Sequence, residues 1–138
     1  MCKKLGLRTV LPDDLQLVRE LLEWMQRESK DYTKTFADLR ASVAEFSEWN
    51  IRWQQRLEQE GNSLVSAEEL MRMVNPKIIP RNHLVEEVLQ AAVERDDYQP
   101  ITEFFEALQN PFAESLVGTK WDQVPAADAK RYRTFCGT

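Results

Sequence analysis

Apolar residues recur at intervals of three and four along most of this chain, the spacing that places side chains on one face of an α-helix. The first such stripe predicts an amphipathic helix over residues 12–29. This segment opens with Pro12-Asp13-Asp14, a rigid first turn with carboxylates where a helix N-terminus favours them. Its apolar positions are Leu15, Val18, Leu22 and Met25, widened by Leu17, Leu21 and Trp24.

The same spacing returns in several later segments. After Asp31 it favours two helices, or one bent helix, with apolar positions Phe36, Leu39 and Val43 and then Phe46, Trp49, Trp53 and Leu57. From about residue 81 the pairs Leu84/Val85, Val88/Leu89 and Ala92/Val93 recur every four residues. A last stripe consists of Ile101, Phe104, Phe105 and Leu108.

Helix boundaries are marked by breakers and caps. Gly61-Asn62 interrupts the pattern, and residues 66–69 (Ser-Ala-Glu-Glu) predict a capping box at the start of the next helix, with Val65 and Leu70 as its hydrophobic staple. Asn75-Pro76 ends that helix, because proline disfavours helical dihedrals in the residue before it. Asn110-Pro111 ends the last one.

These elements define the predicted fold class. No segment alternates apolar and polar residues long enough to indicate a strand, so the chain is predicted to be all-α: a single domain of five to six amphipathic helices with an irregular C-terminal tail. Residues 1–112 form the helical core. Residues 113–138 form the tail, with one short helical turn near residues 126–131. No domain boundary is predicted.

Composition then limits the function classes. The chain has 138 residues, a mass of 16.2 kDa, 43% hydrophobic and 30% charged residues, which is typical of a soluble globular protein. No apolar run is long enough to span a membrane, and residues 1–6 are not followed by the apolar region of a signal peptide, so we do not expect secretion. Two distant cysteines favour a reducing compartment, and we expect a cytoplasmic location, or a mitochondrial one in a eukaryote. The net charge of −5 argues against nucleic acid as a partner.

Several kinds of catalytic site have no support in the sequence. The four glycines stand at positions 6, 61, 118 and 137, too far apart for a phosphate-binding loop. His83 is the single histidine, which argues against a zinc site or a Ser-His-Asp triad. The acidic pairs Glu86-Glu87 and Asp96-Asp97 are interpreted as solvated helix faces. The sequence therefore predicts no catalytic, cofactor-binding or metal site in these residues.

Two constellations have both a structural and a functional interpretation. In the segment NPKIIPRNH (residues 75–83), two prolines stiffen a connection between helices, which favours a structural connector over a ligand contact. Trp49 and Trp53 are favoured as core residues, with the neighbouring Arg52 and Arg56 as solvated surface side chains. The open alternative is an aromatic and cationic interface, used by a freestanding helical interaction module without catalytic activity or by a fragment that packs on another domain.

Four segments and the chain end carry a resemblance to a known family. They are KLGL (residues 4–7), DYTKTFADL (31–39), VNPKIIPRNHLVEE (74–87) and NPF (110–112), followed by Cys136 near the C-terminus. Their order and spacing resemble the C-terminal end of the selenoprotein O family, kinase-like enzymes that transfer AMP to protein hydroxyls. The similarity is weaker over residues 40–65. The family's "Cys-Ser-Ser"-like ending is Cys136-Gly137-Thr138 here.

The resemblance implies that this chain is the tail of a longer protein adenylyltransferase and that Met1 is an internal methionine. ATP and Mg²⁺ would bind to the missing catalytic domain, whose targets are Ser, Thr or Tyr hydroxyls of protein substrates. The implied partner of this chain is its own upstream catalytic domain, and the chain alone is expected to be non-catalytic.

Cys136 is the one candidate for chemistry. The cations Lys130, Arg131 and Arg133 favour its thiolate. The resemblance implies that Cys136 is a redox switch that bonds reversibly to a cysteine of the catalytic domain, which makes Cys2 incidental.

Overall fold

The computed structural model describes residues 1–125, which form helices and loops and contain no strand. The all-α class predicted from the sequence is confirmed. The chain divides into two compact units: unit 1 is Met1–Lys77, and unit 2 begins at Ile78. None of the helices in residues 1–125 is long and apolar enough to cross a membrane.

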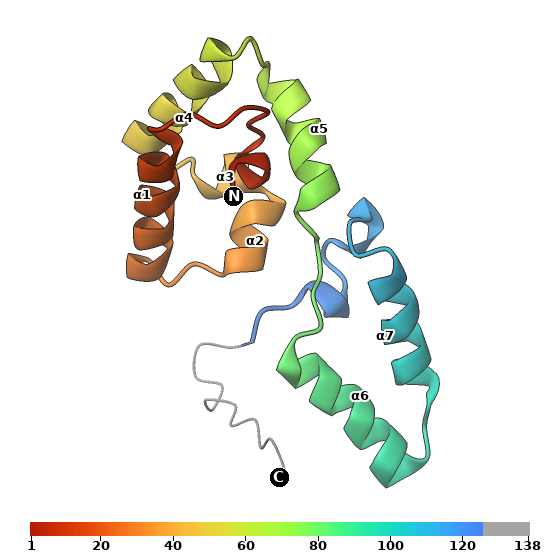
Figure 1. The fold of residues 1–138 in the computed structure, drawn as a ribbon. Coiled ribbons are helices and arrows are strands. Elements are labelled where there is room, and N and C mark those ends of the chain that lie inside the picture. The colour runs from red at the N-terminus through yellow and green to blue at the C-terminus, as the bar shows by residue number, and fades with distance from the viewer. Residues whose placement is uncertain (126–138) are drawn as a thin grey trace. The chain divides into compact units, whose positions relative to one another are not determined.

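Unit 1 contains one short 3-10 helix and five α-helices (Figure 1). Their bounds are η1 Cys2–Leu5, α1 Asp14–Arg27, α2 Tyr32–Ala37, α3 Leu39–Ser42, α4 Ser47–Gln59 and α5 Leu64–Val74. The region after Asp31 thus forms three helices, one more than expected. Asp31 and Asp38 cap α2 and α3 by accepting hydrogen bonds from the Lys34 and Ala41 backbone N–H groups, so Asp38 ends one helix and starts the next.

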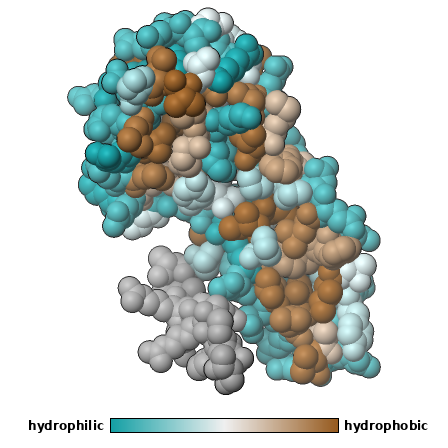
Figure 2. All heavy atoms as spheres, viewed as in Figure 1, coloured by the Kyte–Doolittle hydropathy of each residue, from teal (hydrophilic) through white to brown (hydrophobic). Residues whose placement is uncertain are grey.

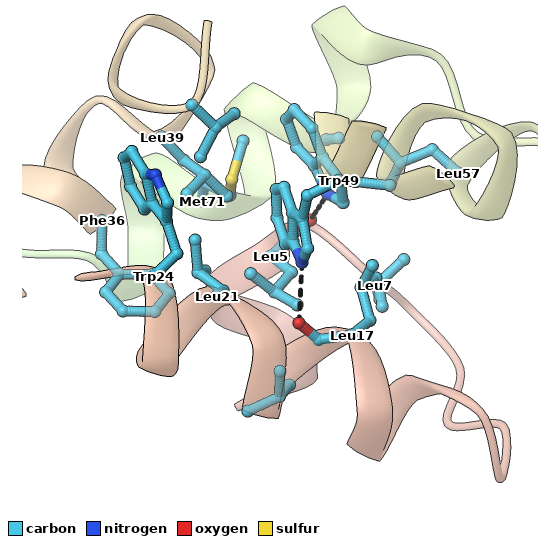
Figure 3. Close-up of a cluster of buried hydrophobic side chains, with 14 of the residues drawn as sticks. Leu5, Leu7, Leu17, Leu21, Trp24, Phe36, Leu39, Trp49, Leu57 and Met71 are labelled. Atoms are coloured by element: carbon cyan, nitrogen blue, oxygen red, sulfur yellow. Dashed lines mark hydrogen bonds between the residues drawn. The ribbon is translucent and has the colours of Figure 1, made fainter. Parts of the chain in front are cut away.

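The core of unit 1 is built around Trp49 and Trp53, both fully buried. The rings are stacked at 5.8 Å between centroids. Each indole N–H donates to a backbone carbonyl at 2.8 Å, Trp49 to Leu17 and Trp53 to Leu5 (Figure 3). The prediction that the two tryptophans are core residues is confirmed. The other buried members are Leu5, Leu7, Leu17, Val18, Leu21, Trp24, Met25, Phe36, Leu39, Val43, Leu57, Ala67 and Met71.

η1 packs closely against α5 because Gly6 has no side chain. A Cβ at Gly6 would lie 2.7 Å from the Cβ of Ala67, and the backbone φ of Gly6 is +74°. Both facts require glycine at this position. The N-cap of α5 is Ser63, whose side chain accepts from the Ser66 N–H. The predicted capping box at residues 66–69 is therefore wrong: the helix begins at Leu64, which packs against the core.

Unit 2 contains α6 Asn82–Arg95, α7 Gln99–Gln109 and the 3-10 helices η2 Glu114–Leu116 and η3 Lys120–Asp122. α6 and α7 form an antiparallel hairpin (Figure 1). The core of unit 2 is Ile78, Leu84, Val88, Phe104 and Trp121. The rings of Phe104 and Trp121 stack at 4.7 Å. The first part of the expected tail, residues 113–125, is therefore folded onto the hairpin, because Trp121 is buried there.

Candidate functional site

The connector at residues 75–80 makes its polar contacts inside the protein. Asn75 is 1% exposed; its Nδ2 donates to the Lys4 carbonyl at 3.0 Å, and its Oδ1 accepts from Lys4 Nζ at 3.2 Å. Lys77, also buried, donates to the Ala37 carbonyl at 2.9 Å. In unit 2 the Ile78 N–H donates to the Pro111 carbonyl at 3.3 Å, which joins two of the segments that carry the family resemblance. These contacts support the structural interpretation of the connector.

The residues considered for metal or acid–base chemistry do not form a site. His83 is half-buried in the first turn of α6. Asp97 accepts a hydrogen bond from the Gln99 N–H at 3.1 Å at the start of α7, and Asp96 is exposed. Among residues 1–125 no group of three or more His, Cys, Asp and Glu side chains is placed to hold a metal ion.

The most developed polar constellation centres on Arg56. Its Nε and Nη2 donate to the Asp14 carboxylate at 2.7 and 3.2 Å. Its Nη1 donates to Glu60 at 3.3 Å, and its Nη2 also donates to the backbone and side-chain oxygens of Thr9 at 3.3 and 3.1 Å. We call Thr9, Asp14, Arg56 and Glu60 the Arg56 network. It ties the segment before α1 to the N-terminus of α1 and to the C-terminal end of α4.

The electrostatics of the network favour its charged form. The hydrogen bond to Asp14 is the main cause that raises the pKa of Arg56, and the Asp14 and Glu60 charges add to it against the effect of burial. Burial alone would raise the pKa of Glu60. Hydrogen bonds from the Arg8 and Thr9 backbone N–H groups and the Thr9 hydroxyl, with the Arg56 charge, outweigh burial and lower that pKa below 4.5.

The expectation that Arg56 is a solvated surface side chain is wrong, since its side chain is only 9% exposed. Arg52 differs: its side chain is 49% exposed and pairs with Glu20. Helical spacing contained the missed signal. Position 56 follows Trp49 by seven residues and Trp53 by three, which places it on the buried stripe. Asp14 likewise precedes Leu17, Val18 and Leu21 at the spacings of three, four and seven.

An open pocket of about 310 Å³ lies beside this network, lined by Asp13, Asp14, Gln16, Leu17, Arg52 and Arg56. The guanidinium groups that line it are engaged with carboxylates: all three nitrogens of Arg56 donate within the network, and both Nη atoms of Arg52 donate to Glu20. The arrangement therefore stabilises unit 1 and offers little to a charged ligand.

The two cysteines differ in what the structure describes. Cys2 is half-buried and packs against the core of unit 1. Cys136, with the nearby Lys130, Arg131 and Arg133, lies outside the described residues, and so does the expected helical turn at residues 126–131.

Taken together, these contacts define an all-α structural region whose distinctive polar residues hold helices and connectors in place. The family model of protein adenylyltransferase SelO matches residues 41–109, half of the chain. Proteins named protein nucleotidyltransferase YdiU are similar over the whole chain: the identity is 42% with that of Halalkalibacterium halodurans, 43% with one of Bacillus cereus and 44% with that of Geobacillus kaustophilus. The chain belongs to the SelO family of protein nucleotidyltransferases, and it spans about 30% of the length of these relatives.

Proposed function

We propose that this chain is the C-terminal helical region of a longer protein adenylyltransferase and supports its catalytic domain. One observation carries the proposal: all of this chain aligns with protein nucleotidyltransferases of which it spans only 30%. The order of the matching segments in the sequence supports the C-terminal position. The parent would act in the cytoplasm.

In the parent protein the catalytic domain would bind ATP with Mg²⁺. A Ser, Thr or Tyr hydroxyl oxygen of a protein substrate would attack the α-phosphorus, forming a phosphodiester to AMP while pyrophosphate leaves. Mg²⁺ would neutralise charge on the phosphates. The residues for these steps would belong to the part of the parent outside the 138 residues.

The role assigned to this chain is mechanical support. Its buried polar groups are largely bonded to one another, as in the Arg56 network and the Asn75–Lys4 pair. Such a network makes the helix packing rigid. A shift of the helices against a neighbouring domain would cost free energy, because each buried polar group would lose its hydrogen-bond partner.

The test compares this chain alone with the same chain joined to the segment encoded upstream of it. Both are incubated with Mg²⁺ and ATP labelled in its α-phosphate. We expect no binding and no label on the 138 residues alone, and self-labelling of the longer protein. Labelling of the 138 residues alone would contradict the proposal. A longer protein that never labels would favour the freestanding interaction module instead.

We also propose that Cys136 is a redox switch of the parent. Its thiol and a cysteine thiol of the catalytic domain would form a disulfide when oxidised glutathione accepts the two electrons, and a dithiol reductant would reverse the reaction. Cys136→Ser in the longer protein should make labelling insensitive to dithiothreitol. Cys2→Ser is the matched control and should leave the sensitivity unchanged. If labelling of the two variants responds equally to dithiothreitol, Cys136 is not the redox switch.

A further inference from the structure

Within the described part of unit 2, residues 78–125, few apolar side chains are buried. Five large residues form its core, against fifteen residues in the core of unit 1. A helical hairpin with such a small core gains little stability from its own packing, since stability rises with the apolar area removed from water. Of the other apolar side chains in residues 78–125, Val85, Ile101, Ala107, Leu108 and Leu116 pack against the edge of this core, whereas Leu89 and Phe105 stay exposed.

Those side chains form matching stripes on the two helices. On α6 the stripe is Val85, Leu89 and Ala92, and on α7 it is Ile101, Phe105 and Leu108. Both have spacings of four and three, so each lies on one side of its helix. Leu89 is 47% exposed and Phe105 is 62% exposed, while the others are half-buried, and Val85, Ile101 and Leu108 are held by contact with the core of unit 2.

The two stripes belong to one face of the hairpin. The buried residues are Leu84 and Val88 on α6 and Phe104 on α7. Around each helix axis, the partly exposed stripe is rotated away from the buried residues in the same direction. Because α6 and α7 are antiparallel, the same displacement brings both stripes to the same side. Figure 2 shows apolar side chains gathered over α6 and α7 on the side of unit 2 turned to the viewer. We call these six residues the α6–α7 face.

The described part of unit 2, residues 78–125, is acidic. Between residues 78 and 125 the only basic residues are Arg81, Arg95 and Lys120, against nine carboxylates. Lys120 is itself paired with Glu103 at 3.1 Å. Helical spacing places Glu86, three residues before Leu89, next to the stripe on α6. A complementary surface therefore has an apolar centre and a basic rim. A second copy of the same acidic face fits poorly, because like charges would oppose each other across the contact.

We propose that the α6–α7 face docks onto the upstream part of the parent polypeptide, on an apolar surface bordered by Lys and Arg. This inference rests on the proposed function, and it names the surface through which the chain supports its catalytic domain. The relatives, of which this chain spans only 30%, are long enough to supply such a surface. The exposure of Leu89 and Phe105 assigns them as the anchors, since they are the residues of this face with the most apolar area left to bury on docking.

The test measures binding of the 138-residue chain to the separately produced upstream segment by calorimetry. Leu89→Ser with Phe105→Ser should weaken binding by at least about tenfold. The matched control is Ile51→Ser with Val65→Ser, two exposed apolar residues on α4 and α5 of unit 1, which should change affinity by less than about twofold. Circular dichroism checks that both variants keep their helices. If the first variant unfolds, Phe105→Gln alone replaces it and should weaken binding several-fold.

Each other outcome overturns the inference. Equal affinity of the test variant and the unmodified chain would show that docking uses a different surface. Absence of any complex would show that the face does not dock, and a dimer of this chain that the substitutions abolish would make the face a self-association surface. The labelling test of the proposed function is separate: that proposal fails if the 138 residues alone are labelled or if the joined protein is never labelled.

Discussion

The guanidinium group of Arg56 and the carboxylate of Asp14 meet through two hydrogen bonds although the residues lie 42 positions apart. Their side chains are 9% and 2% exposed. The same carboxylate accepts a third hydrogen bond, from the Leu11 N–H at 2.7 Å. One ion pair thus fixes α1 on α4 and holds the chain entering α1. Removing either partner would leave the other charge buried and poorly compensated.

We expect Asp14→Asn to lower the free energy of unfolding by about 3–5 kcal/mol, because it removes the countercharge of a buried guanidinium. Urea unfolding followed by circular dichroism measures the effect. Glu20→Gln is the control, since it breaks the exposed pair with Arg52 and should cost under about 1 kcal/mol. In the double variant Asp14→Asn with Arg56→Met, part of the loss should return. Equal losses for Asp14→Asn and Glu20→Gln would show that the buried pair has no special role.

The sequence predicted the parts of the fold that depend on apolar spacing. The stripe Trp49, Trp53 and Leu57 and the stop at Asn75 appear in the structure as expected. Asp14 and Arg56 occupy positions on buried stripes, but the charge of Arg56 led to the prediction that its side chain is solvated. Burial of these two charged side chains is favourable only because they contact each other. No local sequence pattern predicts a partner 42 residues away.

Other differences have the same origin in long-range contacts. Ser63 and Ser66 are both plausible caps, and the packing of Leu64 on the core selects the earlier one. Asn75 ends α5 as expected, and its side chain also bonds Lys4, 71 positions away, a contact that the sequence did not predict. Trp121 follows a segment without periodicity, and only its stacking on Phe104 shows that the segment is folded. The role of Cys136 stays a prediction.

Gly6→Ala should destabilise unit 1 more than Gly61→Ala. Both glycines have positive φ, +74° and +68°, so each substitution carries a left-handed strain of about 1–2 kcal/mol. Only at Gly6 would the new Cβ meet Ala67, at 2.7 Å, whereas nothing lies within 4 Å of it at Gly61. The added overpacking should cost about 1–3 kcal/mol more. Thermal unfolding of the two variants gives the difference, and equal melting temperatures would rule out the close contact between η1 and α5.

Glu60 should make the stability of unit 1 sensitive to acid. Its pKa is lowered below 4.5 in the folded protein, so the stabilisation is fully present above that pH and is lost as the pH falls through the folded pKa. Glu60→Gln should therefore flatten the dependence of unfolding free energy on pH below about 4.5. Urea titrations at a series of pH values between 3 and 7 test this. A variant with the same acid slope as the unmodified chain would show that other carboxylates control it.

Trp121→Ala should loosen unit 2 and leave unit 1 intact. Trp121 is 6% exposed and stacks on Phe104, so its truncation removes one of the five core residues of unit 2 and should cost about 3–5 kcal/mol there. Hydrogen exchange followed residue by residue separates the units, because each amide reports the opening of its own surroundings. We expect amides of α6 and α7 to lose protection while those of α1 and α4 keep it.

The matched control is Val124→Ala, which truncates a partly exposed side chain near the same 3-10 helix and should leave exchange unchanged. Loss of protection in both units with Trp121→Ala would mean that they unfold as one cooperative body, and unchanged protection in α6 and α7 would mean that residues 113–125 contribute nothing to the hairpin.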